Sequence, residues 1–170
     1  MTKIRLILKI IDNISEWSGR IFSVFIVAII GLSLYEVFTR RILGAPTIWT
    51  HEIISYCFAG AVLLTIGYSL KHKTHANVDI VYDYLSLRKK AILDLISYLV
   101  FMVPFTLVLL YESTIFAASS WAMLERTPSA FNFYVFPAKT MLPLGIFLLA
   151  LQMISDIAKV VIFLVKGERI

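Results

Sequence analysis

Charge and cysteine are both scarce in this chain of 170 residues. Only 16% of the residues are charged, whereas a soluble domain carries about a quarter. The single cysteine, Cys57, excludes an intramolecular disulfide and has no histidine beside it to activate a thiol. The hydrophobic share is 59% and the mean hydropathy is +0.85, above the roughly 45–50% of soluble domains. These shortages point to a membrane protein without a soluble catalytic domain.

Long stretches contain no Asp, Glu, Lys, Arg or His at all. They are residues 21–35, 53–70 and 95–111, while the last apolar run contains the polar residues Gln152 and Asp156, with Lys159 nearer its end. Ionisable groups at membrane depth usually mark ion paths, proton relays and substrate sites. No symmetric pair of Gly/Pro-broken helices suggests a transporter site either. The sequence therefore predicts a chain with no conduction route of its own.

The apolar runs predict an all-α membrane protein with four transmembrane helices in one domain, residues 1–170. About 20 helical residues cross a hydrocarbon layer of about 30 Å, and the expected spans cover about residues 17–39, 48–71, 88–117 and 140–165. Pro104 is expected to kink the third span. Residues 2–16 place five apolar side chains on one face, which predicts an N-terminal amphipathic interfacial helix. The alternative is a plain cytoplasmic extension of the first span.

The distribution of cations predicts the orientation. With both termini cytoplasmic, twelve of the 16 Lys and Arg residues lie on the inside and four on the outside, in agreement with the positive-inside rule. The net charge of +5 is thus assigned to a membrane surface, and no nucleic-acid partner is expected. The predicted location is the bacterial or archaeal cytoplasmic (inner) membrane, as a multi-pass protein.

Arg40 and Arg41 oppose this bias, because they lie on the first outer loop. Glu36 precedes Arg40 by one helical turn, and Glu52 opens the second span. Two interpretations remain open: Glu36 or Glu52 holds Arg40 and locks the outer ends of the first two spans, or both arginines extend to outer phosphates. Trp49 is expected at headgroup depth.

Other polar groups give weak signals. His72, His75 and Asp79 are spaced like zinc ligands but lack a fourth ligand. Together with His51, these histidines lie at span ends, where they are unsuited to haem. We expect no metal, no cofactor and no catalytic residue.

Two further features suggest contacts. Gly60 and Gly67 share a helical face and indicate close packing, either within the chain or with another protein. The aromatic segment from residue 119 to 143 suits the outer headgroup level, and its alternative role is a docking face for an outer partner.

Four motifs occur in a particular order: "VFTRRILGAP", "TIWTHEIISY", "GYSLKHKTHANVD" with Gly67, His75 and Asp79, and "FPAKTMLPLGIFLLALQ" with Pro143 and Gly145. Over about residues 15–160 the chain resembles the small membrane subunit of TRAP (tripartite ATP-independent periplasmic) transporters. It departs from the family pattern in having Arg40-Arg41 for Arg-Tyr and His51-Glu52 for Glu-Glu.

The resemblance implies a non-enzymatic scaffold in a secondary-active, Na⁺-coupled system for organic acid uptake. A large TRAP membrane subunit would bind Na⁺ and substrate, and a periplasmic substrate-binding protein would deliver the acid. The small subunit would pack beside the large one, help receive the binding protein and contact membrane lipids. Alternatives are a membrane-anchor subunit of a respiratory or redox enzyme complex, and a small autonomous exporter or channel.

Overall fold

The computed structural model describes residues 2–72 and 86–167, which are helical apart from turns and one isolated antiparallel bridge between Arg126 and Tyr134. The elements are α1 (Thr2–Phe22), α2 (Val24–Arg41), α3 (Ile48–Leu63), α4 (Ile66–Lys71), α6 (Leu87–Ser97), the π-helix η1 (Tyr98–Met102), α7 (Val103–Ala122) and α8 (Phe136–Lys166). Four helical stretches are long and apolar enough to cross a membrane: Lys3–Arg41, Ile48–Lys71, Leu87–Ala122 and Phe136–Lys166. The all-α, four-span fold class is therefore confirmed.

Hydroxyl side chains accompany the breaks within the first two spans. Ser23 separates α1 from α2, and its Oγ donates to the Arg20 carbonyl at 2.7 Å. Thr65 separates α3 from α4, and its Oγ1 donates to the Ala61 carbonyl at 2.6 Å. Such bonds compete with the backbone ladder and bend helices. The first two spans are therefore bent helices rather than straight ones.

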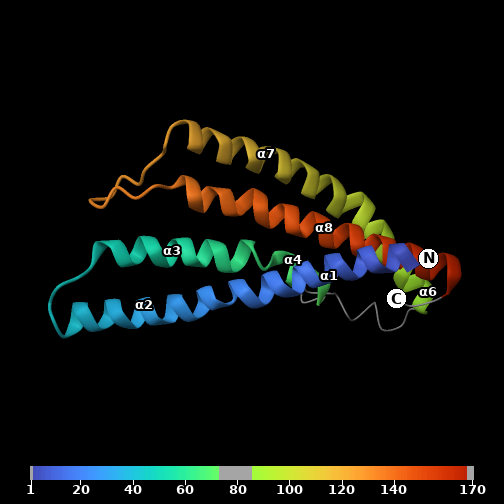
Figure 1. The fold of residues 1–170 in the computed structure, drawn as a ribbon, viewed down its shortest axis with the longest axis horizontal. Helices are drawn as coiled ribbons and strands as arrows, with labels where there is room; N and C mark the ends of the chain where they lie inside the picture. Colours follow the sequence, from blue (N-terminus) through green and yellow to red (C-terminus); the bar gives the residue numbers. More distant parts are fainter. Residues whose placement is uncertain (1, 73–85, 168–170) are drawn as a thin grey trace.

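Pro104 disturbs the third span one turn before its own position. It has no N–H to offer the Val100 carbonyl, and its ring crowds that group. The preceding segment is the π-helix η1, where the Val103 N–H donates to the Tyr98 carbonyl five residues back. The wider turn lets α6 and α7 remain one long helical unit with a change of direction (Figure 1).

Helix α8 lies at the centre of the bundle and packs against α1, α3, α4, α6 and α7, whereas α2 packs mainly on α3. The α2–α3 and α7–α8 connections lie together at one end, which we call the loop end (Figure 1). The start of α1, helix α6 and the finish of α8 lie at the opposite end, which we call the terminal end. An apolar core of Leu70, Leu149 and Met153 lies in the half nearer the terminal end.

Helix α1 has its apolar side turned outward. Ile4, Ile7 and Ile14 are about half exposed, while Leu8 and Ser15 are buried against the bundle. The predicted apolar face of residues 2–16 is thus divided, with Leu8 facing inward. That α1 lies in a membrane interface stays a prediction.

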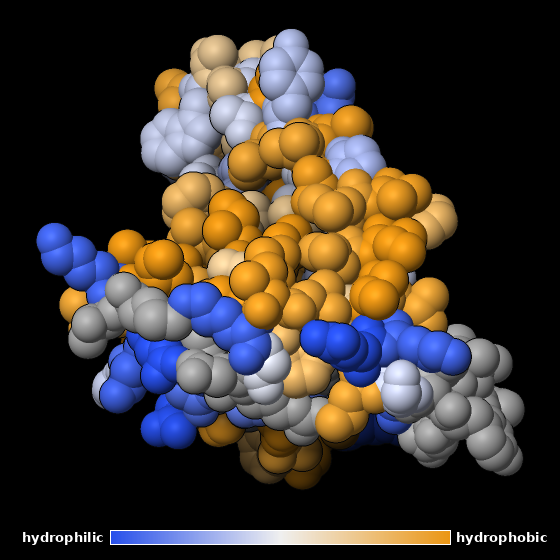
Figure 2. Space-filling view, turned by 90° about the vertical axis from the view of Figure 1, so that its right-hand side faces the viewer, coloured by the Kyte–Doolittle hydropathy of each residue, from blue (hydrophilic) through white to orange (hydrophobic). Residues whose placement is uncertain are grey.

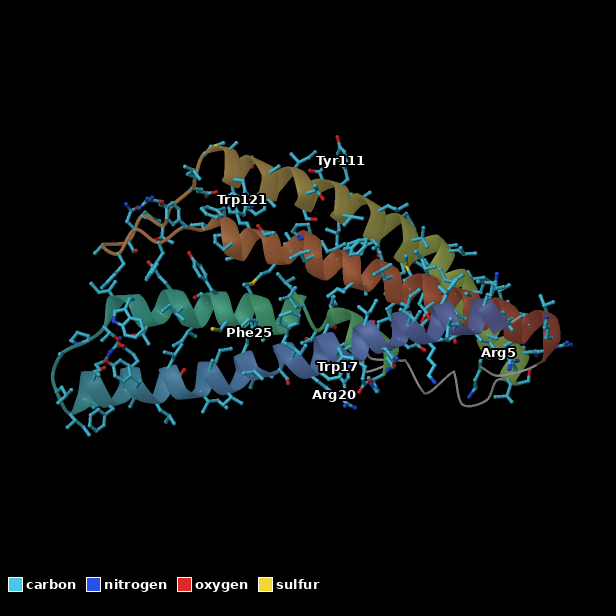
Figure 3. The ribbon with its side chains drawn as sticks, viewed as in Figure 1. Arg5, Trp17, Arg20, Phe25, Tyr111 and Trp121 are labelled. Atoms are coloured by element: carbon cyan, nitrogen blue, oxygen red, sulfur yellow. The ribbon has the colours of Figure 1, made fainter. Side chains whose placement is uncertain are left out.

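Glycines let the helices approach closely. A Cβ on Gly145 of α8 would lie 2.3 Å from the Leu63 carbonyl oxygen, and one on Gly67 would lie 3.1 Å from the Leu148 carbonyl oxygen. A Cβ on Gly60 would lie 2.5 Å from the Phe25 ring, which Figure 3 places on α2 near α3. Gly60 and Gly67 therefore pack within the chain.

We expect Gly145→Ala to lower the free energy of unfolding by about 1–3 kcal/mol, because the added methyl group forces α8 away from α3. Unfolding in SDS, followed by circular dichroism, measures this change. Gly31→Ala in α2 is the control, since no atom outside the neighbouring backbone of its own helix lies within 4 Å of the position that its methyl group would take. It should match or slightly exceed the native stability, and an equal loss in both variants would contradict the packing argument.

Candidate functional site

A buried polar group joins α1 to α8 near the terminal end. We call Asp12, Ser15, Gln152, Ser155, Asp156 and Lys159 the α1–α8 cluster. The Gln152 side chain is fully buried. Its amide nitrogen donates to Asp12 Oδ1 at 3.2 Å and Asp156 Oδ1 at 3.1 Å, and its oxygen accepts from Ser15 Oγ at 2.7 Å. Because both ends of the amide are bonded, Gln152 is satisfied without water.

Lys159 links the two carboxylates of this cluster. Its ammonium lies 2.6 Å from Asp12 Oδ1 and 3.3 Å from Asp156 Oδ1, and all three side chains are a quarter exposed or less. Ser155 Oγ also donates to Asp12 Oδ1 at 3.1 Å. Pairing offsets the cost of placing these charges in a poorly hydrated site, so the cluster fixes α1 against α8.

Glu16 makes a second link, between α1 and the end of α4. Its carboxylate lies 2.6 Å from Lys71 Nζ, 3.0 Å from His72 Nε2 and 3.0 Å from Arg20 Nη2. Figure 2 shows hydrophilic side chains spread across this terminal end, with hydrophobic residues above and between them. Charged side chains thus gather at the terminal end.

The sequence indicated Gln152 and Asp156 as polar residues of the last span but did not indicate their partners. The amphipathic pattern of residues 2–16 predicts Asp12 on the polar side of that helix, opposite most of the apolar side chains, whereas it faces the bundle together with Ser15. The available signal was the spacing of Leu8, Asp12 and Ser15, which places them on one helical face. That face packs on the face of α8 that carries Gln152 and Lys159.

Glu36 is the centre of a second cluster, at the loop end, which we call the α2–α3 clasp. Its Oε1 accepts from Arg40 at 2.7 Å, and its Oε2 accepts from the Thr47 backbone N–H at 3.3 Å and Thr50 Oγ1 at 3.2 Å. The Thr47 hydroxyl also donates to Oε2 and contacts Thr50 Oγ1. The clasp closes the loop between the two helices.

The α2–α3 clasp shows which of the two glutamates considered, Glu36 or Glu52, pairs with Arg40. Glu36, not Glu52, holds Arg40, whose side chain is still 65% exposed. Thr47 occupies the N-cap position of α3 but makes no capping bond, because its hydroxyl goes to Glu36. Arg41 is exposed and makes no ion pair with the part of the chain that the structure describes. The Trp49 ring lies 5.9 Å from that of Tyr35, centroid to centroid.

The segment 123–135 between α7 and α8 folds into a hairpin-like turn, which we call the aromatic hairpin. The Thr127 N–H donates to the Phe133 carbonyl at 2.8 Å, and the Val135 N–H donates to the Glu125 carbonyl at 2.9 Å. The Arg126 guanidinium lies 3.9 Å from the centre of the Tyr134 ring. The turn is thus an ordered surface feature rather than an extended strip.

Two bonds join the aromatic hairpin to α3. Thr127 Oγ1 donates to Glu52 Oε2 at 3.3 Å, and Tyr56 OH donates to the Tyr134 carbonyl at 3.1 Å. Glu52 therefore connects the two loops of this end rather than pairing with Arg40. At the start of α8, Lys139 Nζ lies 2.5 Å from Glu125, and this ammonium holds the pKa of the Glu125 carboxyl below its usual value.

The other residues that the sequence analysis selected make none of these contacts or lie outside the described residues. Pro143 lies inside α8, two residues before Gly145. His75 and Asp79 lie outside the described residues. No group of three or more His, Cys, Asp or Glu side chains within residues 2–72 and 86–167 is arranged to hold a metal ion.

Glu112 is a charged residue of the third membrane-spanning stretch that the sequence-based search missed, because the charge-free stretch ends at residue 111. It lies in the middle of α7 and is exposed. It is outside both clusters, and it faces away from the interior of the bundle. The described spans are thus not free of charge, and the charged groups that lie between helices are those of the α1–α8 cluster and the α2–α3 clasp, together with the Glu16 and Lys139 pairs.

Comparison with known proteins identifies the family. Residues 29–162 match the family described as tripartite ATP-independent periplasmic transporters, DctQ component. The chain belongs to this family. It is also 25% identical over 72 residues to the sialic acid TRAP transporter permease protein SiaT of Haemophilus influenzae (strain 86-028NP). That match covers 42% of this chain and 11% of SiaT, so the chain spans only a small part of its relative.

Family membership settles three earlier expectations. The chain is a small permease component of a TRAP transporter and not an enzyme. With four helices able to cross a membrane, it is a multi-pass inner-membrane protein. The alternative of a redox-enzyme anchor is not supported by this family.

We expect Asp12 and Lys159 to be energetically coupled. In a double-mutant cycle of Asp12→Asn and Lys159→Gln, the coupling energy should be about 0.5–1.5 kcal/mol, since the pair is largely enclosed. Unfolding in SDS provides the four stabilities. Arg20→Gln is the control and should change little, because its side chain is 69% exposed. Additive effects of the two cluster variants would contradict the assignment.

We also expect acid to loosen the aromatic hairpin. The lowered pKa of Glu125 means that its pairing stabilises the hairpin above the ordinary glutamate value of 4.5 and is lost as the pH falls below it. Fluorescence of Trp121, which lies 4.2 Å from the Phe136 ring between centroids, should report this change in a background where Trp17 and Trp49 are phenylalanine. In Glu125→Gln the acid transition should vanish. An unchanged transition would assign it to another group.

Proposed function

We propose that this chain is the scaffold subunit of a secondary-active, Na⁺-coupled TRAP transporter for an organic acid. A large membrane subunit would hold Na⁺ and substrate, and this chain would hold no cofactor. Its family membership supports a role within a tripartite system. The relative named for sialic acid supports an organic acid as the transported solute.

The observation that carries this proposal is the placement of the charges. In the described spans, most ionisable side chains are paired with one another near the two ends, as in the α1–α8 cluster and the α2–α3 clasp. Glu112 lies on an outward face. A transport path needs polar groups along an interior route, so these helices suit the bracing of a moving neighbour.

We place the terminal end in the cytoplasm and the loop end outside. Exposed cations gather at the terminal end, among them Lys3, Lys9, Arg88, Lys89 and Lys166, as the positive-inside rule favours. The aromatic hairpin would then lie at the outer surface. Its Phe131 and Tyr134 side chains are exposed, and ordered aromatic side chains of this kind are common in docking surfaces. We therefore assign the reception of the periplasmic binding protein to this hairpin.

A pull-down from native membranes tests the proposal. The tagged chain should retain a much larger, very hydrophobic multi-span protein that requires mild detergent for its retention. Recovery of a soluble redox enzyme instead, or of no partner in any mild detergent, would contradict it. A haem absorbance band in the purified chain would contradict it as well.

Removal of the Glu36 carboxylate from the α2–α3 clasp gives a second test of the proposed function. Glu36→Ala removes the acceptor of both threonines and of Arg40, so the first outer loop should lose its fixed shape. Recovery of the large subunit in the pull-down, together with uptake in cells, should then fall severalfold. Arg40→Gln should have a small effect because that guanidinium is mostly exposed. Equal losses would show that the arginine, rather than the clasp, is required.

A further inference from the structure

The outward face of α7 carries one carboxylate within a long apolar stripe. The stripe follows the helical repeat through Phe101, Phe105 and Val108 and continues beyond Glu112 through Phe116 to Met123. The apolar members are between 48% and 75% exposed. We propose that this face, which we call the Glu112 face, is the contact surface for the large membrane subunit. The partner would present a cation or a hydrogen-bond donor to the carboxylate.

Glu112 lies at the middle of this apolar stripe. It is eleven positions from Phe101 and eleven from Met123, or about 16 Å in each direction along a helix. The stripe is therefore about 33 Å long, close to the thickness of the hydrocarbon layer. A carboxylate at this depth is costly when it faces lipid and usually has a partner or lines a cavity.

No partner for Glu112 comes from residues 2–72 or 86–167, since no hydrogen bond or ion pair reaches its side chain. Lys139, whose ammonium lies 4.1 Å from the centre of the Phe116 ring on this face, is paired with Glu125 instead. Tyr111, the neighbour of Glu112, is 67% exposed and projects away from the bundle (Figure 3). Neither of these adjacent polar side chains has a hydrogen-bond partner among the residues that the structure describes.

The outward surface of helix α2 differs from that of α7. It is also at the periphery of the bundle and packs mainly on α3. Its residues 24–35 contain no charged side chain, and Val27 in this stretch is 69% exposed. Such a surface suits lipid without any polar partner. The two peripheral helices therefore have different surroundings, and α7 is the one that requires a protein.

The carboxylate of Glu112 indicates which kind of partner covers this face. Lipid tails offer no donor at mid-depth. A second copy in a two-fold dimer would place Glu112 of each copy close to the same interface, where like charges repel. A large subunit that binds Na⁺ and substrate must carry polar groups within the membrane. This identification of the partner rests on the proposed function.

Site-directed photo-crosslinking tests the surface in the assembled complex. A benzophenone amino acid at Val108, one turn from Glu112, should form an adduct with the co-expressed large subunit. The matched probe at Val27 of α2 should form none. A complex that co-purifies but crosslinks from Val27 and not from Val108 would overturn the Glu112 face while leaving the proposed function intact. An adduct of two copies of this chain would also overturn it.

Substitution tests the carboxylate itself. Glu112→Gln should leave the isolated chain at least as stable as before, because the exposed charge contributes nothing to the bundle. The same variant should retain roughly tenfold less large subunit in the pull-down, because the partner's donor loses its charged acceptor. Glu112→Asp should recover part of the retention. Full retention by Glu112→Gln would contradict the proposal, whereas a failure of the native chain to retain any large subunit would instead contradict the proposed function.

Discussion

A charge in a membrane-spanning helix is costly unless another group bonds to it, and this constraint organises the described bundle. Asp12 reaches across from α1 to Lys159 of α8, with Gln152 between the helices. At the other end, Glu36 binds Arg40 on one side of the loop between α2 and α3 and two threonine hydroxyl groups on the other side. Both arrangements use polar bonds to fix one helix against another.

Helix α8 joins these locally bonded regions, because it packs against most of the other helices. Gly145 lets it approach the α3 backbone, and Gly67 lets α4 approach its own backbone. Small residues at such crossings allow close van der Waals contact, which replaces the hydrophobic effect inside a membrane. Because α8 packs against five other helical elements, a stable α8 gives every peripheral surface a fixed position. That rigidity is what a bracing subunit needs.

The sequence was sufficient for the fold class, because the length and polarity of four apolar runs depend only on local composition. It also placed Gly60, Gly67 and Pro104 at points where the helices pack or bend. The partner of Arg40 stayed open, since helix spacing favoured Glu36 while Glu52 was also near in the chain. Asp12 and Gln152 are separated by 140 residues, and only the tertiary structure brings them together. Glu112 was missed for a simpler reason: it lies just beyond the stretch counted as free of charge.

In the proposed complex these helices brace a transporting partner and carry no solute themselves. This claim can be tested with vesicles that contain only this chain. The vesicles are loaded with a sodium-sensitive dye and are offered labelled organic acids. We expect no sodium entry and no acid accumulation above empty vesicles, under an imposed gradient in either direction. Accumulation of the acid by the chain alone would show that it transports solute and does more than brace a partner.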